Sequence, residues 1–356
     1  MGGKTFPVTF KQLNPLGLAR LDFGRQVPAG KVTLKFDYTA PFGDGPAGLY
    51  HVEVGDKWYS WTQFESIDAR AAFPSFDEPG YKTPFTVSLT TQPGFEAVSN
   101  APETGTEKHG DLVTHIFAPT KPLPTYLMAF VVGPFATVAT EAAPTEYRKE
   151  PLPIRIVATQ ANADRMEFAK ENSGPIVDLL EKYFGERFPF PKLDQIGSPI
   201  MPGAMENAGA DIYGDGILLL DQNPTTSDKQ EFGMVVAHEL SHQWFGDLVT
   251  PAWWDDIWLN ESFANWMGYR IGNEWRPDLN IGTNAIGEAF DAMELDSLKA
   301  GRPIHEKITS DKDINGAFDA ITYGKGGQVV AMIAAYMGDE AFQKGVRLHL
   351  KRHAYG

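Results

Sequence analysis

The sequence predicts an α+β protein in which a domain of antiparallel β-strands precedes a mainly helical domain. Up to about residue 140, short apolar stretches alternate with turns rich in Gly and Pro, a pattern typical of antiparallel sheet. From about residue 162 the apolar residues recur with a helical period. The length of 356 residues also favours two hydrophobic cores. We expect domains at 1–142 and 143–356, because residues 141–145 have the composition of a junction.

In the first domain, two segments show the alternation of apolar and polar residues that a half-buried strand requires. Residues 32–38 (VTLKFDY) and 85–90 (FTVSLT) both alternate in this way, and turn residues follow them at 41–46 and 92–94. We therefore expect both segments to be strands of an antiparallel sheet.

In the second domain, the first helix and the strand that follows it are each predicted from a local pattern. Residues 163–184 are amphipathic, and we expect Gly174 and Pro175 to interrupt the helix that they form. Residues 211–221 (DIYGDGILLLD) are apolar, short and rich in residues that favour sheet, so they predict a strand.

Three further helices are predicted downstream. Residues 227–230 (SDKQ) have the form of a capping box, which indicates the start of a helix that continues to His242. Residues 257–271 and 324–337 show the apolar period of two later helices.

The composition excludes several classes of protein. The chain has no cysteine, so any metal must be held by His, Asp or Glu. A formal net charge of −15 argues against binding to nucleic acid and to anionic membranes. We find neither a transmembrane segment nor the apolar core of a signal peptide. The absence of cysteine and of a signal peptide favours a reducing compartment such as the cytoplasm.

Residues 238–242 (HELSH) form an H-E-x-x-H motif on the helix that ends at His242. Because residues i and i+4 share one face of a helix, the imidazoles of His238 and His242 can bind one metal ion. Glu239 follows the first ligand and points beside the metal, where a water molecule would bind. Taken alone, the motif also fits an exposed helix with two unrelated histidines.

Glu261 is the candidate third ligand. It follows His242 after eighteen residues (243–260) and lies on the next predicted helix. Two His and one Glu leave the fourth position of a single Zn²⁺ ion open for water, which is the arrangement of hydrolytic zinc sites. Glu239 would then take a proton from that water and pass it to the leaving amine. A solvated helix glutamate is the alternative interpretation of Glu261 by itself.

Further motifs resemble those of one enzyme family. Residues 203–207 (GAMEN) precede the H-E-x-x-H motif and Glu261, and this order is similar to that of the gluzincin zinc aminopeptidases, which include membrane alanyl aminopeptidase and leukotriene hydrolase. Other segments with the same likeness are 62–65 (TQFE), 68–79 (DARAAFPSFDEP), 123–130 (LPTYLMAF) and 318–326 (FDAITYGKG). The resemblance covers nearly the whole chain. It implies a β-sandwich-like N-terminal domain followed by a thermolysin-like catalytic domain.

The resemblance also implies a function and the residues that serve it. The chain would be a metallo-aminopeptidase that removes single residues from peptides with a free N-terminus. Glu206 and Glu65 would bind the substrate ammonium, with Gln63 beside them, and Tyr323 would donate a hydrogen bond to the oxyanion. The residues whose backbone would line the peptide as an added strand are Gly203, Ala204, Met205, Glu206 and Asn207. Without the resemblance, Tyr323 is interpreted as a core tyrosine and Glu65 as a surface carboxylate.

The sequence departs from the family pattern in two ways. Ser75 stands where many relatives have a cysteine, which affects no catalytic assignment. Relatives are usually several hundred residues longer, so we expect a truncated or reduced version of the fold, without the first β-strands and without the helical C-terminal domain. An uncovered helix face is an apolar patch, and we therefore expect the chain to dimerise or to need a complementary fragment.

Two other functions stay open at this stage. Epoxide hydrolysis, as in leukotriene hydrolase, is the first, and Glu65 argues against it because that relative has glutamine there. A zinc-bound but inactive fragment with a binding role is the second, and only the missing C-terminal part favours it. The motifs do not determine the preferred N-terminal residue, because the walls of its pocket come from scattered positions.

Overall fold

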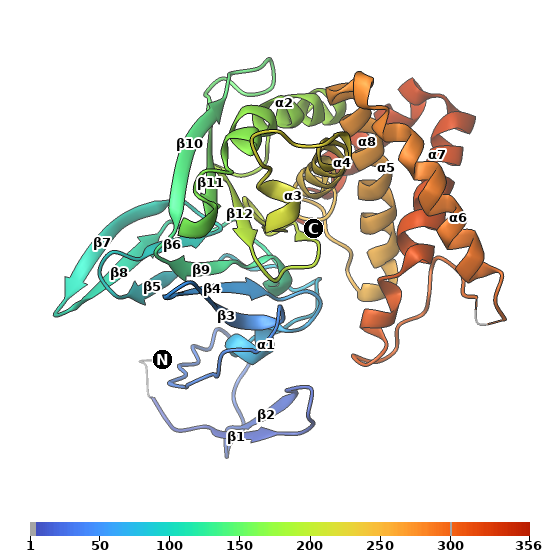
Figure 1. Ribbon diagram of the computed structural model, residues 1–356. Coiled ribbons are helices and arrows are strands. Elements are labelled where there is room, and N and C mark those ends of the chain that lie inside the picture. Colours follow the sequence, from blue (N-terminus) through green and yellow to red (C-terminus); the bar gives the residue numbers. More distant parts are fainter. Residues whose placement is uncertain (1–4, 300) are drawn as a thin grey trace.

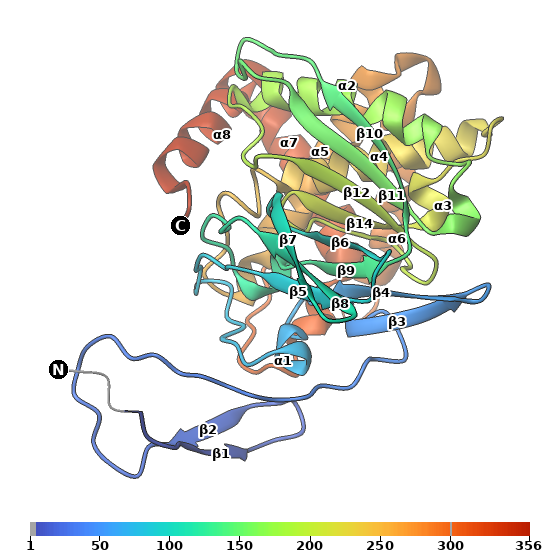
Figure 2. The same ribbon diagram turned by 90° about the vertical axis from the view of Figure 1, so that its left-hand side faces the viewer.

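Two antiparallel sheets make up the N-terminal part of the computed structural model, which describes residues 5–299 and 301–356 (Figure 1). The strand orders are β3-β4-β9-β6 and β5-β8-β7. The strands are β3 (Gly48–Val54), β4 (Lys57–Gln63), β5 (Ser88–Thr91), β6 (Glu96–Ser99), β7 (Glu103–His109), β8 (Leu112–Phe117) and β9 (Phe130–Gly133). A hairpin of β1 (Thr9–Gln12) and β2 (Ala19–Asp22) lies apart from both sheets (Figure 2), and α1 (Ala69–Ala72) is a single helical turn.

A mixed five-stranded sheet begins the C-terminal part. Its order is β10-β11-β12-β14-β13, with parallel pairs in the centre and an antiparallel pair at each edge. The strands are β10 (Ala136–Ala142), β11 (Leu152–Ala158), β12 (Leu193–Ser198), β13 (Ala204–Met205) and β14 (Ala210–Gly214).

The helices of the C-terminal part gather beside this sheet (Figure 1). They are α2 (Glu167–Phe184), α3 (Asp215–Leu218), α4 (Thr226–His242), α5 (Ile257–Trp275), α6 (Ala285–Asp296), α7 (Gly326–Met337) and α8 (Asp339–His353). Within the described ranges, none of the helices has the length and apolarity that crossing a bilayer requires.

The N-terminal sheet β3-β4-β9-β6 packs against the five-stranded sheet through buried aromatic and aliphatic side chains. Tyr50 and Trp61 belong to the same buried cluster as Ile196 and Ile212. The Tyr50 hydroxyl lies 2.9 Å from the Ser198 hydroxyl, so the polar end of this buried ring also has a partner across the contact. The two parts therefore share one continuous interior, in which the site described below is placed.

The predicted fold class is confirmed, because an antiparallel β domain precedes a catalytic part of sheet and helices. The division at residues 142 and 143 stays a prediction. Strand β10 pairs along its whole length with β11, from Ala136↔Ala158 to Ala142↔Leu152, so that division would separate two strands of one sheet. We propose a boundary between β9 and β10 instead, where the chain passes from one sheet to the other.

Residues 32–38 are extended but do not form the predicted strand. The apolar side chains of this segment, among them Val32 and Tyr38, are exposed, and the segment pairs with no strand among the described residues. Alternation supplies the apolar face of a strand, but a strand also needs a neighbour that takes its backbone hydrogen bonds. The second predicted strand forms in part, since β5 begins at Ser88 and not at residue 85.

The predicted interruption at Gly174-Pro175 is wrong, because helix α2 continues through these residues to Phe184. Pro175 removes one backbone hydrogen bond, which normally breaks a helix. Buried side chains before and after it, such as Ala169 and Leu180, hold the helix in the core. Helix α2 also packs against β10, and a Cβ added at Gly174 would make an ordinary contact of 3.6 Å with Ala142. Tertiary packing thus outweighs the local cost.

Two boundaries near the motif helix also differ from the prediction. The strand expected at 211–221 ends at Gly214, since its partner β12 ends at Ser198, and the chain then turns into α3. The capping box lies two residues earlier than expected: the Asp228 N–H donates to Thr225 Oγ1 at 3.2 Å, and the Thr225 N–H donates to Asp228 Oδ2 at 2.8 Å. Helix α4 therefore begins at Thr226.

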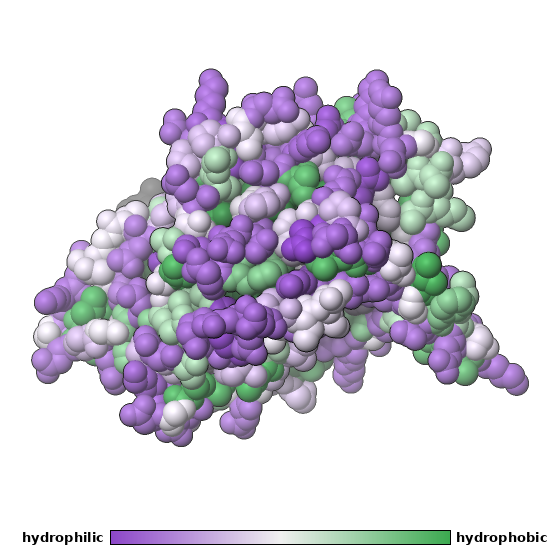
Figure 3. Space-filling model, turned by 45° about the horizontal axis from the view of Figure 1, so that its top comes forward, coloured by the Kyte–Doolittle hydropathy of each residue, from purple (hydrophilic) through white to green (hydrophobic). Residues whose placement is uncertain are grey.

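The two later helices are confirmed with small changes. Helix α5 covers the predicted 257–271 and extends to Trp275. Residues 321–325 form a π-helical turn, so α7 begins at Gly326. Helices α6 and α7 expose apolar side chains, including Phe290, Met293 and Met332. Hydrophobic residues gather at the right-hand edge of Figure 3, on the side where Figure 1 places α6 and α7. That this face binds a second copy or a complementary fragment stays a prediction.

Candidate active site

Helices α4 and α5 bring the three predicted metal ligands together. They pack closely because glycines face the neighbouring helix: a Cβ on Gly268 would lie 2.8 Å from the carbonyl oxygen of Met234, and one on Gly272 would lie 3.0 Å from that of Gly233. This contact places Glu261, near the start of α5, beside the end of α4. The H-E-x-x-H spacing puts both histidines on the face that meets it.

The three side chains form a buried cluster with the spacing of one coordination sphere. The Nε2 atoms of His238 and His242 are 3.1 Å apart, and Glu261 Oε2 lies 3.4 Å and 3.6 Å from them. Tetrahedral zinc with bonds of about 2.0–2.2 Å separates its ligand atoms by roughly 3.3–3.5 Å. His242 Nδ1 lies 3.2 Å from the Phe245 carbonyl oxygen, which fixes the ring so that Nε2 faces the cluster. The donor set therefore fits a metal ion.

The charges in this cluster are strongly coupled. Burial lowers the pKa of His238, which favours the neutral ring that a metal requires. Burial also opposes the charge on His242, but the carboxylates of Glu206 and Glu261 outweigh it and hold that pKa well above its usual value. Burial would raise the pKa of Glu261, yet the two histidines hold it well below its usual range. These carboxylates therefore favour the protonated ring of His242, and a proton there competes with a metal ion.

Glu239 lies beside this cluster on the same helix. Its side chain is buried, and a carboxylate oxygen of Glu239, one of Glu206 and a ring nitrogen of His242 lie within 4.8 Å of one another. Burial, together with the negative charge of Glu206, raises the pKa of Glu239 well above the usual value of a carboxylic acid. A carboxylate with a raised pKa next to a metal site is a stronger base than an ordinary surface glutamate.

A second acidic group adjoins the metal ligands. Glu65 follows β4, Glu206 follows β13, and their carboxylates lie within 4.8 Å of each other and of Glu261. One carboxylate oxygen of each, together with Gln63 Oε1, is buried without a hydrogen-bond partner among the described residues. Burial and Glu261 raise the pKa of Glu206 to about 7, although His242 opposes this. Buried acceptors next to like charges form a group that a cation would stabilise.

The 203–207 segment lies at the edge of the five-stranded sheet. Strand β13 pairs with β14 through Ala204↔Tyr213 and Met205↔Ile212, and no strand of the described chain pairs with its other edge. Gln63 approaches from the N-terminal domain, where its side-chain amide lies 3.5 Å from the sulfur of Met205. An unpaired strand edge beside a group of acidic side chains can take up an extended peptide.

Tyr323 lies in the π-helical turn of residues 321–325, which packs against α5. Its ring centre is 6.1 Å from that of His238. Burial, together with the negative charge of Glu261, raises the pKa of Tyr323 well above its usual value, so the phenol keeps its proton and can donate it in a hydrogen bond. The Asn265 side chain donates to the Tyr323 carbonyl at 3.1 Å, and the Arg302 guanidinium donates to Thr322 Oγ1 at 2.9 Å.

Most of the chain matches two known protein-family models. Residues 168–356 match the model of the peptidase family M1 domain, and residues 4–127 match that of the peptidase M1 N-terminal domain. The chain belongs to peptidase family M1. The likeness to gluzincin aminopeptidases is thereby confirmed, and both matched regions lie in the order that the sequence predicts.

The M1 chain is similar to aminopeptidases from distant organisms. It is 36% identical over 341 residues to "Aminopeptidase M1-B" of Oryza sativa subsp. japonica, which covers 94% of this chain and 38% of the relative. It is 37% identical over 337 residues to "Aminopeptidase 2, mitochondrial" of Saccharomyces cerevisiae, covering 92% and 35%. "Probable aminopeptidase 2" of Sulfurisphaera tokodaii is 36% identical over 313 residues, covering 87% and 39%. The chain spans less than two fifths of the length of these relatives.

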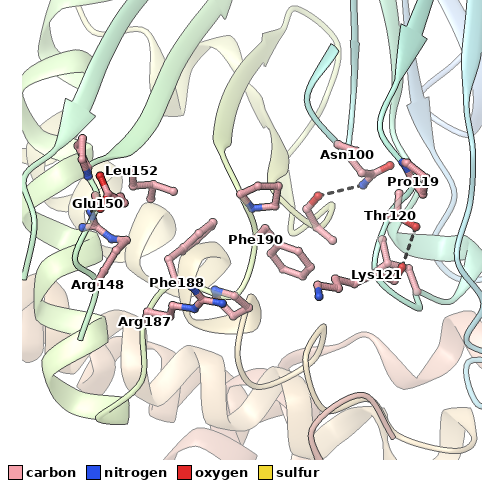
Figure 4. Close-up of a pocket in the computed structure, with 16 residues that line it drawn as sticks. Asn100, Pro119, Thr120, Lys121, Arg148, Glu150, Leu152, Arg187, Phe188 and Phe190 are labelled. Carbon is pink, nitrogen blue, oxygen red and sulfur yellow. Dashed lines mark hydrogen bonds between the residues drawn. The ribbon is translucent and has the colours of Figure 1, made fainter. Parts of the chain in front are cut away.

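A separate pocket of about 290 Å³ lies between segments of the N-terminal and C-terminal parts (Figure 4). Among the residues that line it are Asn100, Lys121, Phe190 and Ala208, but none of the predicted site residues of this M1 chain. The Asn100 amide donates to the Ala208 carbonyl at 3.1 Å and to the Leu127 carbonyl at 2.7 Å. Through Ala208, the pocket borders the chain that directly follows the 203–207 segment.

Sequence reasoning missed several buried polar residues around the site. Gln243 directly follows His242, and its side chain contacts the segment after the GAMEN motif. Arg302 holds the turn that carries Tyr323, and Lys192 is buried with its ammonium 2.7 Å from the Gly209 carbonyl oxygen. The position of Gln243 beside a metal ligand was the one signal available in the sequence. Arg302 and Lys192 are linked to no motif that the sequence analysis used.

Proposed function

We propose that this chain carries the active site of a zinc-dependent aminopeptidase, which cleaves the first peptide bond of substrates with a free N-terminus. The observation that carries the proposal is the position of the acidic group. Glu65 and Glu206 each present a buried oxygen atom that has no hydrogen-bond donor among the described residues, directly beside the donor set of His238, His242 and Glu261. A substrate ammonium fits the first group while the adjacent carbonyl reaches the second.

The proposed chemistry follows from the groups around the cluster. Zinc held by the two histidines and Glu261 supplies Lewis-acid activation of water and of the scissile carbonyl. Glu239 accepts the proton of the attacking water and passes it to the leaving amine, for which its raised pKa is suited. The Tyr323 phenol donates a hydrogen bond to the oxygen that becomes negative as the water attacks.

The proposed exopeptidase specificity depends on the charge of the substrate ammonium and on the distance from Glu206 to the metal ligands. The ammonium occupies the place between Glu65 and Glu206, with Gln63 beside it, and only a free N-terminus carries that charge. The edge of β13 takes the first residues as an added strand, through the backbone of Gly203 to Asn207. The short distance from Glu206 to the metal ligands leaves room for one residue before the scissile bond.

Peptides with a free N-terminus are expected to be cleaved, and the same peptides with an acetylated N-terminus to be spared. Glu206→Ala should raise KM by about tenfold to a hundredfold, because a hydrogen bond to a charged group contributes about 1.5–3 kcal/mol. Steady-state kinetics on aminoacyl anilides measures this, and Glu186→Ala, an exposed glutamate, is the control. Internal cleavage of an acetylated peptide at a comparable rate would make the chain an endopeptidase.

Tyr323→Phe removes the oxyanion donor with almost no change in volume. We expect kcat to fall by about a hundredfold or more while KM changes little, because the hydrogen bond strengthens only as negative charge develops. Tyr336→Phe, on the exposed face of α7, is the matched control and should leave both constants unchanged. An unchanged kcat in Tyr323→Phe would return this residue to the role of a core tyrosine.

A further inference from the structure

The segment that carries Glu206 is attached to the metal helix by one buried side chain. Gln243 is the C-cap of α4, directly follows His242 and is fully buried. Its Oε1 accepts the Gly209 N–H at 2.8 Å. Its Nε2 donates to the Glu206 carbonyl oxygen at 3.1 Å and to Asp211 Oδ1 at 2.7 Å. All three hydrogen bonds of the amide therefore go to residues 206–211.

The orientation of this amide is determined by its partners. The Gly209 N–H can only donate, and the Glu206 carbonyl can only accept. Rotating the amide by 180° would place an NH₂ group against the N–H and an oxygen against the carbonyl. The contact is thus a specific three-point attachment, and its loss would leave buried donors and acceptors unpaired.

The other attachments of this segment lead away from the metal helix. The Ala208 carbonyl accepts from Asn100 of the N-terminal domain, drawn as a dashed line in Figure 4, and the Gly209 carbonyl accepts from Lys192 near the start of β12. Within the part of the chain that the structure describes, Gln243 is the residue at the end of α4 that hydrogen-bonds to residues 206–211. It is the polar link between the metal ligands and this segment.

The position of the Glu206 carboxylate depends on this backbone. Its Oε1 has no hydrogen-bond partner among the described residues, so that atom is not held by a contact of its own. Movement of the Glu206 backbone relative to His242 would change the distance between the bound ammonium and the metal ligands. Displacement of this carboxylate would weaken its charge-assisted hydrogen bond to the ammonium, because such bonds depend on distance and angle.

We propose that Gln243 is a positioning residue that sets the distance between the carboxylate of Glu206 and the metal ligands, and thereby the affinity of the site for the substrate ammonium. The proposal rests on the proposed aminopeptidase function. It assigns Gln243 no contact with the substrate or with the metal. Its effect reaches the reaction only through Glu206.

The test replaces Gln243 by residues of similar size and measures the 356-residue chain with an unblocked aminoacyl anilide. Gln243→Met removes all three hydrogen bonds, and Gln243→Glu keeps the shape but replaces the Nε2 donor by oxygen. We expect KM to rise by about tenfold or more and kcat to change by less than about threefold. The reason is that the interaction with the ammonium stabilises the bound substrate and the transition state to the same extent. Zinc content, measured by elemental analysis, should stay at one per chain.

Gln230→Met is the matched control. Gln230 lies on the same helix and donates to the Leu279 carbonyl oxygen at 2.7 Å, at the end of α4 away from the metal ligands. Its replacement removes a glutamine side-chain hydrogen bond of the same kind, and we expect neither KM nor kcat to change. A rise in KM in this control equal to that in Gln243→Met would show a general effect of loosening α4 and would contradict the proposal.

A double-mutant cycle separates positioning from other roles. In a Glu206→Ala background, Gln243→Met should produce no further rise in KM, because the residue through which it acts is gone. A full additional rise would show that Gln243 acts elsewhere. An unchanged KM, a loss of zinc, or unfolding of both Gln243 variants would also overturn the proposal. A wild-type chain that binds zinc but cleaves no unblocked anilide would instead refute the aminopeptidase function itself.

Discussion

Chelation of the metal is expected to abolish hydrolysis by this chain, and added zinc is expected to restore it. The physical reason is that the proposed nucleophile is a water molecule. This water depends for its activation on the ion that His238, His242 and Glu261 would bind. Activity on an aminoacyl anilide should be followed during dialysis against a chelator and then against zinc, with the zinc content measured at each step. An active preparation without bound metal would contradict the proposal.

The pH dependence of zinc binding follows from the same cluster. Glu206 and Glu261 raise the pKa of His242, so without the ion this ring carries a proton that zinc must displace. Lowering the pH below that pKa should weaken zinc binding by about tenfold per unit, because one proton competes with the ion. Raising the pH should strengthen binding until the ring is neutral. Replacing the exposed His353 by Ala should change neither the zinc content nor this dependence.

Glu239→Gln is expected to keep the zinc and to lose the activity. The substitution preserves the shape of the side chain but removes its ability to accept the proton of the attacking water. We expect kcat to fall by roughly a hundredfold or more, since a positioned general base contributes about 10²–10⁴ to the rate. Steady-state kinetics and elemental analysis on the same preparation measure both quantities.

The matched control for this substitution is Glu231→Gln, which lies exposed on the same helix and should leave kcat unchanged. If zinc is lost together with activity in Glu239→Gln, Glu239 supports the metal site and the role of base belongs to another group. A kcat close to that of the wild type would exclude the role of general base outright.

The sequence alone predicts the parts of the site that depend on local spacing. His238 and His242 lie on one helix face because i and i+4 always do, and Glu261 lies on the next helix because the apolar period shows where that helix runs. The order of β-rich and helical parts follows from periods of two and 3.6 in the same way. These properties are set by near neighbours in the chain, so the sequence contains them directly.

Tertiary contacts decide what the local pattern leaves open. Residues 32–38 alternate as a strand does, yet no neighbouring strand of the described chain takes their hydrogen bonds. Pro175 should break a helix, yet packing of α2 against β10 holds it together. The first segment lacks the distant contact that its local preference would need, and in the second the packing free energy exceeds the local cost of Pro175.

The acidic group of Glu65 and Glu206, and the hydrogen bonds of Gln243 to its backbone, are also decided by tertiary contacts. The GAMEN motif identifies Glu206, but the approach of Glu65 from the N-terminal domain to within 4.8 Å follows only from the packing of the two parts. Gln243 meets Gly209, Glu206 and Asp211 across 34, 37 and 32 residues of chain. No short-range pattern encodes contacts of that separation. The sequence by itself therefore predicted the candidate metal ligands and determined the order of the domains, whereas the burial and charge of the site arose where distant segments met, because burial and like charges act only through space.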